Sequence, residues 1–310
     1  MSWSVVPACD AQPAKVPRIG VLAERPASDP MLEAFVAGLR ELGYVEGRTI
    51  VIEWRYGQGG VENYPRLAAE LAALDLDVLV VGGSIAAQSA RAAAPTVPIV
   101  FTAVGDPVAA GLVSRLSHPG GNATGLSNVA ADLAGKQLAL LKSAAPAIRR
   151  VAVIHNPLNS APSLANVRDA ARSLGVELGL FGVRKPGEVP RALAATKTMR
   201  PDAILALSDP VVGNSMSELV RFTLAQRLPS IYTRAQYADE GGLLAYGPDF
   251  RANYRRAATY VDRILKGAKP GDLAVEQPTT FELVINLKTA KALGLTIPAS
   301  LRQQAERVVE

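Results

Sequence analysis

The sequence predicts an α/β fold of two doubly wound lobes, each built on a parallel sheet and joined by a hinge that the chain crosses three times. Short apolar runs alternate with segments of helical periodicity, and parallel strands need such helices between them. The pattern that begins at Arg18 also begins again at Arg150, with similar elements in the same order. A chain of 310 residues is long enough for two domains.

The first half of the chain begins with an apolar run at residues 18–22 and a polar turn. Met31, Phe35 and Leu39 then recur at helical spacing, and Gly43 is placed to end that helix. The elements expected next are strands at 50–54, 78–81 and 99–102 and helices at 64–74 and 85–94.

The second half repeats this order. A strand at 150–154 is followed by a turn and a helix that ends at Leu174 and Gly175. The following elements are expected to be strands at 177–183, 202–205 and 229–233, a helix at 189–199, a strand at 242–246, a helix at 250–266 and a strand at 281–286.

The hinge is expected where the chain passes between these units, at residues 120–125, 233–241 and 276–280. We therefore assign residues 18–121 and 239–277 to lobe one and residues 122–238 and 278–310 to lobe two. Residues 1–17 are expected to be a disordered tail or the remnant of a leader. Cys9 and the residues before it loosely resemble the end of a lipoprotein signal, and an exported chain and a cytoplasmic tail both fit.

Composition excludes several classes of protein. Lys and Arg give a net charge of +5 without a long run, and aromatic residues make up 5%, so nucleic acid is not an expected partner. Apolar runs are too short for a membrane helix. A single cysteine allows no intrachain disulfide.

Ligands of open parallel sheets bind at the carboxyl ends of the strands, so residues that follow strands are the candidates for binding. Ser84 follows a buried strand and opens a helix, where a serine caps the helix and free N–H groups attract a carboxylate. Asp209 has the matching place in the second unit, and Arg234 could pair with a carboxylate. The expected ligand-binding residues are Ser28, Gly83, Ser84, Ala103, Asp106, Asn156, Ser160, Ser208, Asp209, Arg234, Tyr246, Gly247 and Asp249.

Each candidate also has a structural interpretation. Asp106 and Asp209 precede prolines and can cap helices, Asn156 suits a turn, and Arg234 could form a surface ion pair. Enzyme motifs are absent: the sequence has no G-x-S-x-G, no phosphate loop and no H-E-x-x-H. We therefore expect no catalytic residue, no metal and no cofactor.

Several stretches together resemble bacterial ABC-transporter substrate-binding proteins of the tryptophan/tyrosine type, which have the type I periplasmic-binding fold. The matching stretches are residues 18–22, 38–44, 101–108 (FTAVGDPV), 116–126 (LSHPGGNATGL), 241–247 and 264–270. The resemblance implies a monomer that captures a small carboxylate-bearing ligand, an aromatic amino acid or an aromatic or organic acid, between its lobes. It also implies a permease partner in the inner membrane and a place in the periplasm or on a lipid anchor.

One departure from the family concerns the charge of the ligand. Where an amino-acid binder of this family would be expected to carry an acid after the strand at 229–233, this chain has Arg234. We therefore expect a ligand with an extra acid group or without an amine. A ligand-sensing receptor subunit and a two-lobed enzyme such as a racemase are the alternatives, although the enzyme would need acid/base groups across the cleft.

Overall fold

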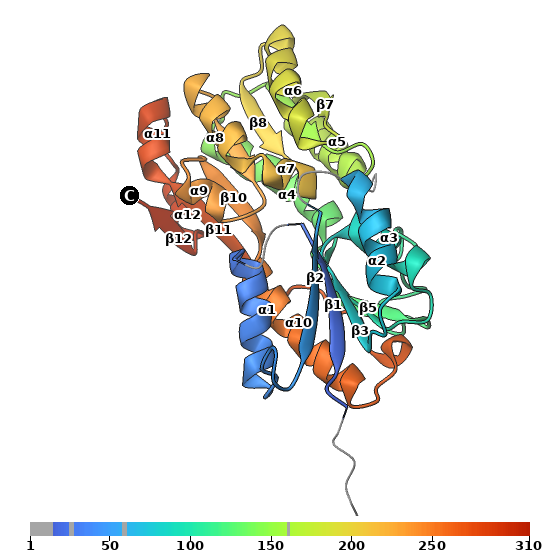
Figure 1. The fold of residues 1–310 in the computed structure, drawn as a ribbon. Coiled ribbons are helices and arrows are strands. Elements are labelled where there is room, and N and C mark those ends of the chain that lie inside the picture. The colour runs from blue at the N-terminus through green and yellow to red at the C-terminus, as the bar shows by residue number, and fades with distance from the viewer. Residues whose placement is uncertain (1–14, 25–27, 58–60, 160–161) are drawn as a thin grey trace, which may run out of the picture.

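The computed structural model describes residues 15–24, 28–57, 61–159 and 162–310, which form two α/β lobes (Figure 1). The predicted fold class is confirmed. Most of the expected leader falls outside the described residues.

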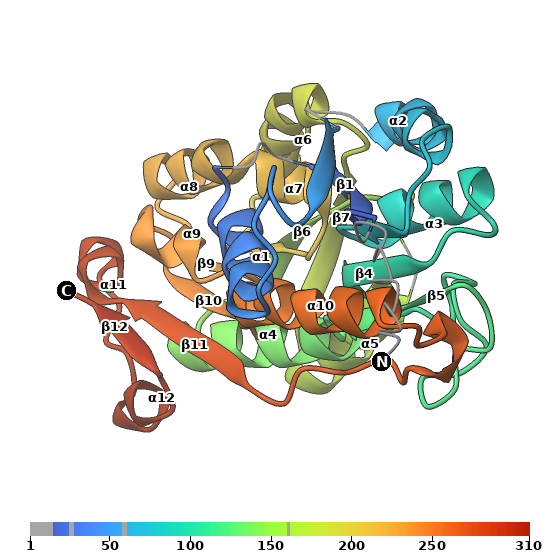
Figure 2. The same ribbon diagram turned by 60° about the horizontal axis from the view of Figure 1, so that its bottom comes forward.

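The sheet of lobe one has five strands in the order β2-β1-β3-β4-β5, all parallel. Its strands are β1 (Arg18–Ala23), β2 (Val51–Tyr56), β3 (Val78–Val81), β4 (Ile99–Val104) and β5 (Ala123–Ser127). Helices cover both faces: α1 (Pro30–Glu41) and α10 (Phe250–Leu265) on one, α2 (Tyr64–Ala72) and α3 (Ser84–Ala93) on the other (Figure 2).

Residues on alternate positions of β1 explain why both faces need helices. Ile19 and Val21 pack with Phe35 of α1 and Val261 of α10, whereas Leu22 packs into the cluster under α2 and α3. These residues are at most 1% exposed, so the sheet is buried on both sides as apolar parallel strands require.

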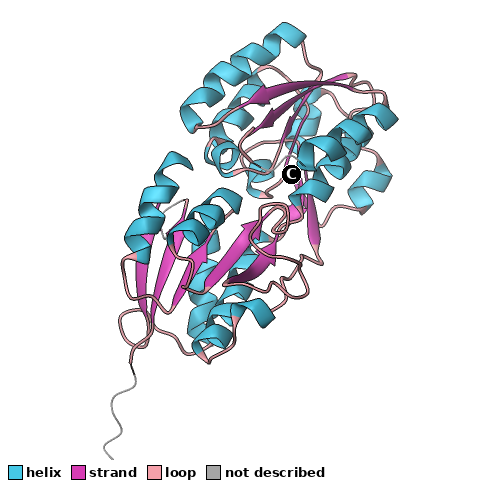
Figure 3. Ribbon diagram, turned by 90° about the vertical axis from the view of Figure 1, so that its right-hand side faces the viewer, coloured by secondary structure: helices cyan, strands magenta, loops and turns pink. Residues whose placement is uncertain are grey.

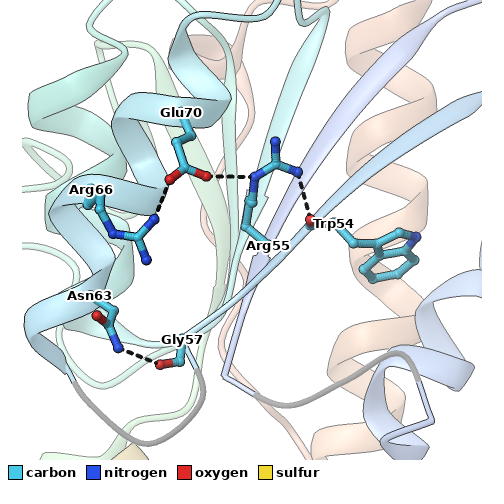
Figure 4. A network of polar contacts seen from close by, with 6 residues as sticks. All are labelled: Trp54, Arg55, Gly57, Asn63, Arg66 and Glu70. Carbon is cyan, nitrogen blue, oxygen red and sulfur yellow. Dashed lines mark hydrogen bonds and ion pairs between the residues drawn. The ribbon is translucent and has the colours of Figure 1, made fainter.

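A polar network fastens the edge strand β2 to α2 (Figure 4). Arg55 Nε donates to Glu70 Oε2 at 3.0 Å, and Arg66 also pairs with Glu70. Asn63 Nδ2 donates to the carbonyl of Gly57 at 3.1 Å, where the strand ends. The network holds the first turn of α2 beside the end of the strand.

The sheet of lobe two has seven strands in the order β12-β11-β10-β9-β8-β6-β7. They are β6 (Arg150–His155), β7 (Glu177–Gly182), β8 (Ala203–Ala206), β9 (Ser230–Tyr232), β10 (Leu244–Pro248), β11 (Phe281–Asn286) and β12 (Arg307–Val309). Only the β10–β11 pair is antiparallel among the described pairs, and Figure 3 shows both sheets between their helices.

The helices of lobe two include α4, which follows β5 directly and packs against α5. They are α4 (Ala130–Ala144), α5 (Pro162–Leu174), α6 (Val189–Thr196), α7 (Pro210–Asn214), α8 (Met216–Ala225), α9 (Gln236–Asp239), α11 (Leu287–Leu293) and α12 (Ala299–Gln303).

The chain divides between the lobes at residues other than those expected. β5, expected to belong to lobe two, pairs with β4 in lobe one, and β10, expected in lobe one, pairs with β9 in lobe two. The chain therefore crosses after β5, after β10 and before β11. The sequence ATGLS of β5 has few large apolar residues, although all five are buried, so an apolar pattern could not show this strand.

Glu276 connects the three crossings. Its backbone N–H donates to the Gly125 carbonyl of β5 at 3.0 Å, and its carbonyl accepts from Ser127 N at 2.9 Å. Its carboxylate accepts from Nε and Nη2 of Arg256 in α10, at 2.9 and 2.8 Å. The last crossing thus lies against the first, and α10, which follows the second, is bonded to both through this residue.

Candidate functional site

A cavity between the lobes is lined by residues that follow the strands of both sheets. Its volume is about 50 Å³, within about 610 Å³ of space outside the protein atoms that includes open solvent. Lobe one contributes Glu24, Met31, Gly82, Gly83, Ser84, Ala103, Gly105, Asn128, Phe250 and Tyr254; lobe two contributes Asn159, Ser208, Asp209, Pro210 and Arg234. Six of the thirteen expected residues therefore line it: Gly83, Ser84, Ala103, Ser208, Asp209 and Arg234.

The N-terminus of α3 is one wall of the cavity. Gly83 is its N-cap, with φ of 85°, a left-handed conformation that glycine adopts without strain. Ser84, which was expected to cap the helix, is instead its first residue, and its Oγ accepts from Gly105 N at 3.3 Å. Glycine has no side chain, so residue 83 cannot accept a hydrogen bond from the first N–H groups of α3.

Asp209 stands at the matching position in lobe two but acts as a cap. Its Oδ1 accepts from Val211 N at 2.7 Å and from Val212 N at 3.4 Å, and its Oδ2 accepts from Asn159 Nδ2 at 2.9 Å. Burial raises the pKa of this carboxyl to about 6, although these hydrogen bonds act to lower it. The wall of lobe two therefore holds a carboxyl whose charge is costly to bury.

Arg234 enters the cavity just after β9. Its Cζ lies 5.6 Å from the ring centroid of Phe250, which begins α10 in the opposite lobe. Burial acts to lower its pKa, but negative groups, Glu24 foremost, outweigh this and raise the pKa of Arg234. The cavity thus carries a cation on lobe two that is coupled to an acid on lobe one.

The remaining expected residues lie elsewhere. Those outside the cavity lining are Ser28, Asp106, Asn156, Tyr246, Gly247 and Asp249, and Ser160 lies outside the described residues.

Several of these residues have structural partners. Asp106 accepts from Val108 N and Ala109 N, and Asp249 caps α10 by accepting from Ala252 N. Asn156 is buried and accepts from Leu158 N at 2.9 Å. Tyr246 stacks on Phe281 with ring centroids 6.0 Å apart.

Nine residues of the cavity lining were not among the expected binding residues. They are Glu24, Met31, Gly82, Gly105, Asn128, Asn159, Pro210, Phe250 and Tyr254. Glu24, Gly105 and Asn159 also follow strands, so the rule that predicted their neighbours could have included them. Phe250 and Tyr254, four residues apart on α10, share one helix face, and this spacing was the available signal.

The two lobes touch beside the cavity. Val61 of lobe one packs against core clusters of both lobes. A Cβ at Gly83 would lie 3.4 Å from Cγ of Pro210 in lobe two. Residues from both lobes therefore enclose the same space.

The described residues hold neither a metal cluster nor a membrane-spanning helix. No cluster of three His, Cys, Asp or Glu side chains able to hold a metal ion occurs in the described part of the chain. Among the same residues, no helix combines the length and apolar character needed to cross a membrane.

Two α/β lobes, joined by three crossings and enclosing a cavity at their strand ends, define a two-lobed binding protein. The family model for ABC transporter substrate binding proteins matches residues 18–309. The chain belongs to this family and is therefore a substrate-binding protein of an ABC transporter.

Known relatives extend this result. The chain is 28% identical over 279 residues to a tyrosine-binding protein of Clostridioides difficile, covering 89% of this chain and 80% of that protein. A crystal structure of an ABC domain from Streptococcus pneumonia in complex with L-Trp is 27% identical, with a TM-score of 0.86 and coverage of 94% of this chain and 99% of that one.

A third relative is a structure without ligand. The ligand-free, open structure of a substrate-binding protein with adhesive properties from Clostridium difficile is 26% identical and covers 95% of this chain and 99% of its own. Its TM-score is only 0.65. The corresponding score of the L-Trp complex is 0.86, at similar identity and coverage.

Proposed function

We propose that this protein works outside the cytoplasm as a monomer and delivers a small carboxylate-bearing ligand to a permease in the inner membrane. The ligand is an aromatic amino acid or an aromatic acid, held between the lobes and released when they open. A ligand that touches both lobes favours the closed arrangement over the open one. No catalytic step is part of this function.

The observation that carries the proposal is the composition of the cavity. Met31, Phe250 and Tyr254 offer apolar and aromatic surface, which suits the body of an aromatic ligand. Arg234 offers a cation for its carboxylate, and Glu24 offers an acid that could receive an ammonium group. The relatives described as binding L-Trp and tyrosine support the same class of ligand.

Because Glu24 lies in the cavity, the ligand can be one with an amino group or one without it. The expectation from Arg234 alone is a ligand without an amine, whereas the pair of Glu24 and Arg234 can also serve a zwitterion. Matched probes separate the two: L-tryptophan against indole-3-propionate, and L-tyrosine against 3-(4-hydroxyphenyl)propionate.

We expect one member of these pairs to raise the melting temperature in a thermal-shift assay. A ligand at about 100 times its Kd that binds only the native state adds about 2.7 kcal/mol, which corresponds to a shift of several degrees. Preference for the deaminated acid would support the Arg234 interpretation, and preference for the amino acid would assign the ammonium to Glu24. No shift with any aromatic carboxylate would contradict the proposed ligand class.

A further inference from the structure

Arg234 is held in place from both lobes. On one side it lies against the Phe250 ring, at 5.6 Å from Cζ to the ring centroid. On another it packs against Gly213 of α7, where a Cβ would lie 3.2 Å from Nη2, 3.3 Å from Cζ and 3.4 Å from Nη1. A side chain at residue 213 would crowd the guanidinium, so the glycine makes room for it.

These contacts leave hydrogen-bonding capacity for a ligand. An aromatic ring attracts a guanidinium through its face and does not use up its N–H donors in the guanidinium plane. Arg234 lines the cavity, and its raised pKa keeps it a cation there. Positioned donors of this kind match the two oxygens of a carboxylate.

We propose that Arg234 determines specificity by holding the carboxylate of the ligand, and that Phe250 completes this subsite only when the lobes close. The inference rests on the proposed function and adds to it that the carboxylate subsite is assembled from both lobes and sets the specificity. Arg234 belongs to lobe two and Phe250 to lobe one, so their contact depends on closure. The carboxylate of a ligand would therefore meet the complete subsite, Arg234 with Phe250, only in the closed form.

The test is isothermal titration calorimetry on the full chain with four probes that share an indole: L-tryptophan, indole-3-propionate, L-tryptophanamide and tryptamine. The first two carry a carboxylate and the last two do not. The variants are Arg234→Gln, Arg234→Lys and, as a control of equal charge change, Arg221→Gln on the exposed side of α8. Circular dichroism melts check that each variant folds.

We expect Arg234→Gln to weaken the binding of the carboxylate probe by about a hundredfold, because removing one partner of a buried charge pair is costly. Arg234→Lys keeps the charge but loses the planar fork, so we expect a loss of about tenfold. Arg221→Gln should bind as the wild type does. Binding of any probe without a carboxylate should be the same in Arg234→Gln and wild type.

Carboxylate binding by Arg234→Gln within about threefold of wild type would overturn the inference. A wild-type preference for tryptamine over L-tryptophan would also overturn the inference. In that case the proposed capture of a small solute would still hold. If Arg234→Gln does not fold, Arg234→Lys decides by the same comparison between probes. If the wild type binds none of the four indole probes, the same comparison is made between L-tyrosine, 3-(4-hydroxyphenyl)propionate and tyramine. If it binds none of either series, the ligand class of the proposed function is refuted, and this inference with it.

Discussion

Replacing Gly247 with alanine should lower the free energy of unfolding by about 3 kcal/mol. A Cβ at this position would lie 2.1 Å from the carbonyl oxygen of Thr233 and 2.9 Å from its Cγ2. The oxygen belongs to the backbone, so it can move only if β10 shifts against β9. Gln137 of α4 resists such a shift, because its Nε2 donates to Tyr246 O at 2.7 Å and to Thr233 Oγ1 at 3.2 Å.

Urea unfolding followed by circular dichroism measures this effect. Gly187→Ala is the matched control, because a Cβ there meets nothing within 4 Å. We expect the control to change the free energy of unfolding by about 0.5 kcal/mol or less. Equal stability of Gly247→Ala and Gly187→Ala would show that the approach of β10 to Thr233 is not as close as described. Gly247 was expected to bind the ligand, whereas in the structure it allows β10 to approach the backbone of Thr233.

The free energy of unfolding of the wild type should fall as the pH rises and Asp209 loses its proton. Replacing Asp209 with asparagine should remove this fall. Burial raises the folded-state pKa of this carboxyl to about 6, from an ordinary value of 3.8. A raised carboxyl pKa means that the folded state binds the proton more tightly than the unfolded state does. Its contribution is therefore fully present below about pH 3.8 and is lost as the pH rises through about 6. The shift corresponds to about 3 kcal/mol at most.

The measurement is the free energy of unfolding of wild type and Asp209→Asn at about pH 5 and about pH 7.5. An asparagine oxygen can still accept from Val211 N and Val212 N, so the variant keeps the helix cap but does not titrate. Comparing the two proteins cancels the other titrating groups. We expect the stability of Asp209→Asn relative to wild type to increase toward the higher pH. A difference that stays constant with pH would refute the prediction. Asp209→Ser, which also caps without titrating, should behave like the asparagine variant.

The sequence predicted strands best where they are apolar and buried on both faces. The runs at β3 and β8 and the helix that begins at Phe250 were expected close to their actual bounds. β5 and β12 were not expected, because β5 is rich in small and polar residues and β12 is only three residues long. The antiparallel direction of β11 depends on how the last crossing runs, which the local pattern does not encode.

The sequence could predict those residues of the cavity whose positions depend on the sheet of one lobe alone. Gly83 and Asp209 follow parallel strands, and a parallel sheet gathers such positions at one edge. Phe250 and Met31 lie in helices, and they reach the cavity only because the lobes face each other. Asp106 and Asp249 have the same sequence features as binding residues, yet their carboxylates accept from backbone N–H groups near their own helical turns. Capping and ligand binding use the same side chains, so sequence alone could not separate them.

The exchange of helices at the crossings has a consequence for the order of folding. The apolar face of β1 that carries Ile19 and Val21 is covered partly by Val261 of α10, which is made only after the central strands of lobe two. Residues 18–127 alone therefore form an incomplete core. During synthesis, the face of the first sheet that α10 covers therefore remains exposed until most of the second lobe has left the ribosome. Contacts between such distant segments slow folding, so the chain stays without its full tertiary structure until it is nearly complete.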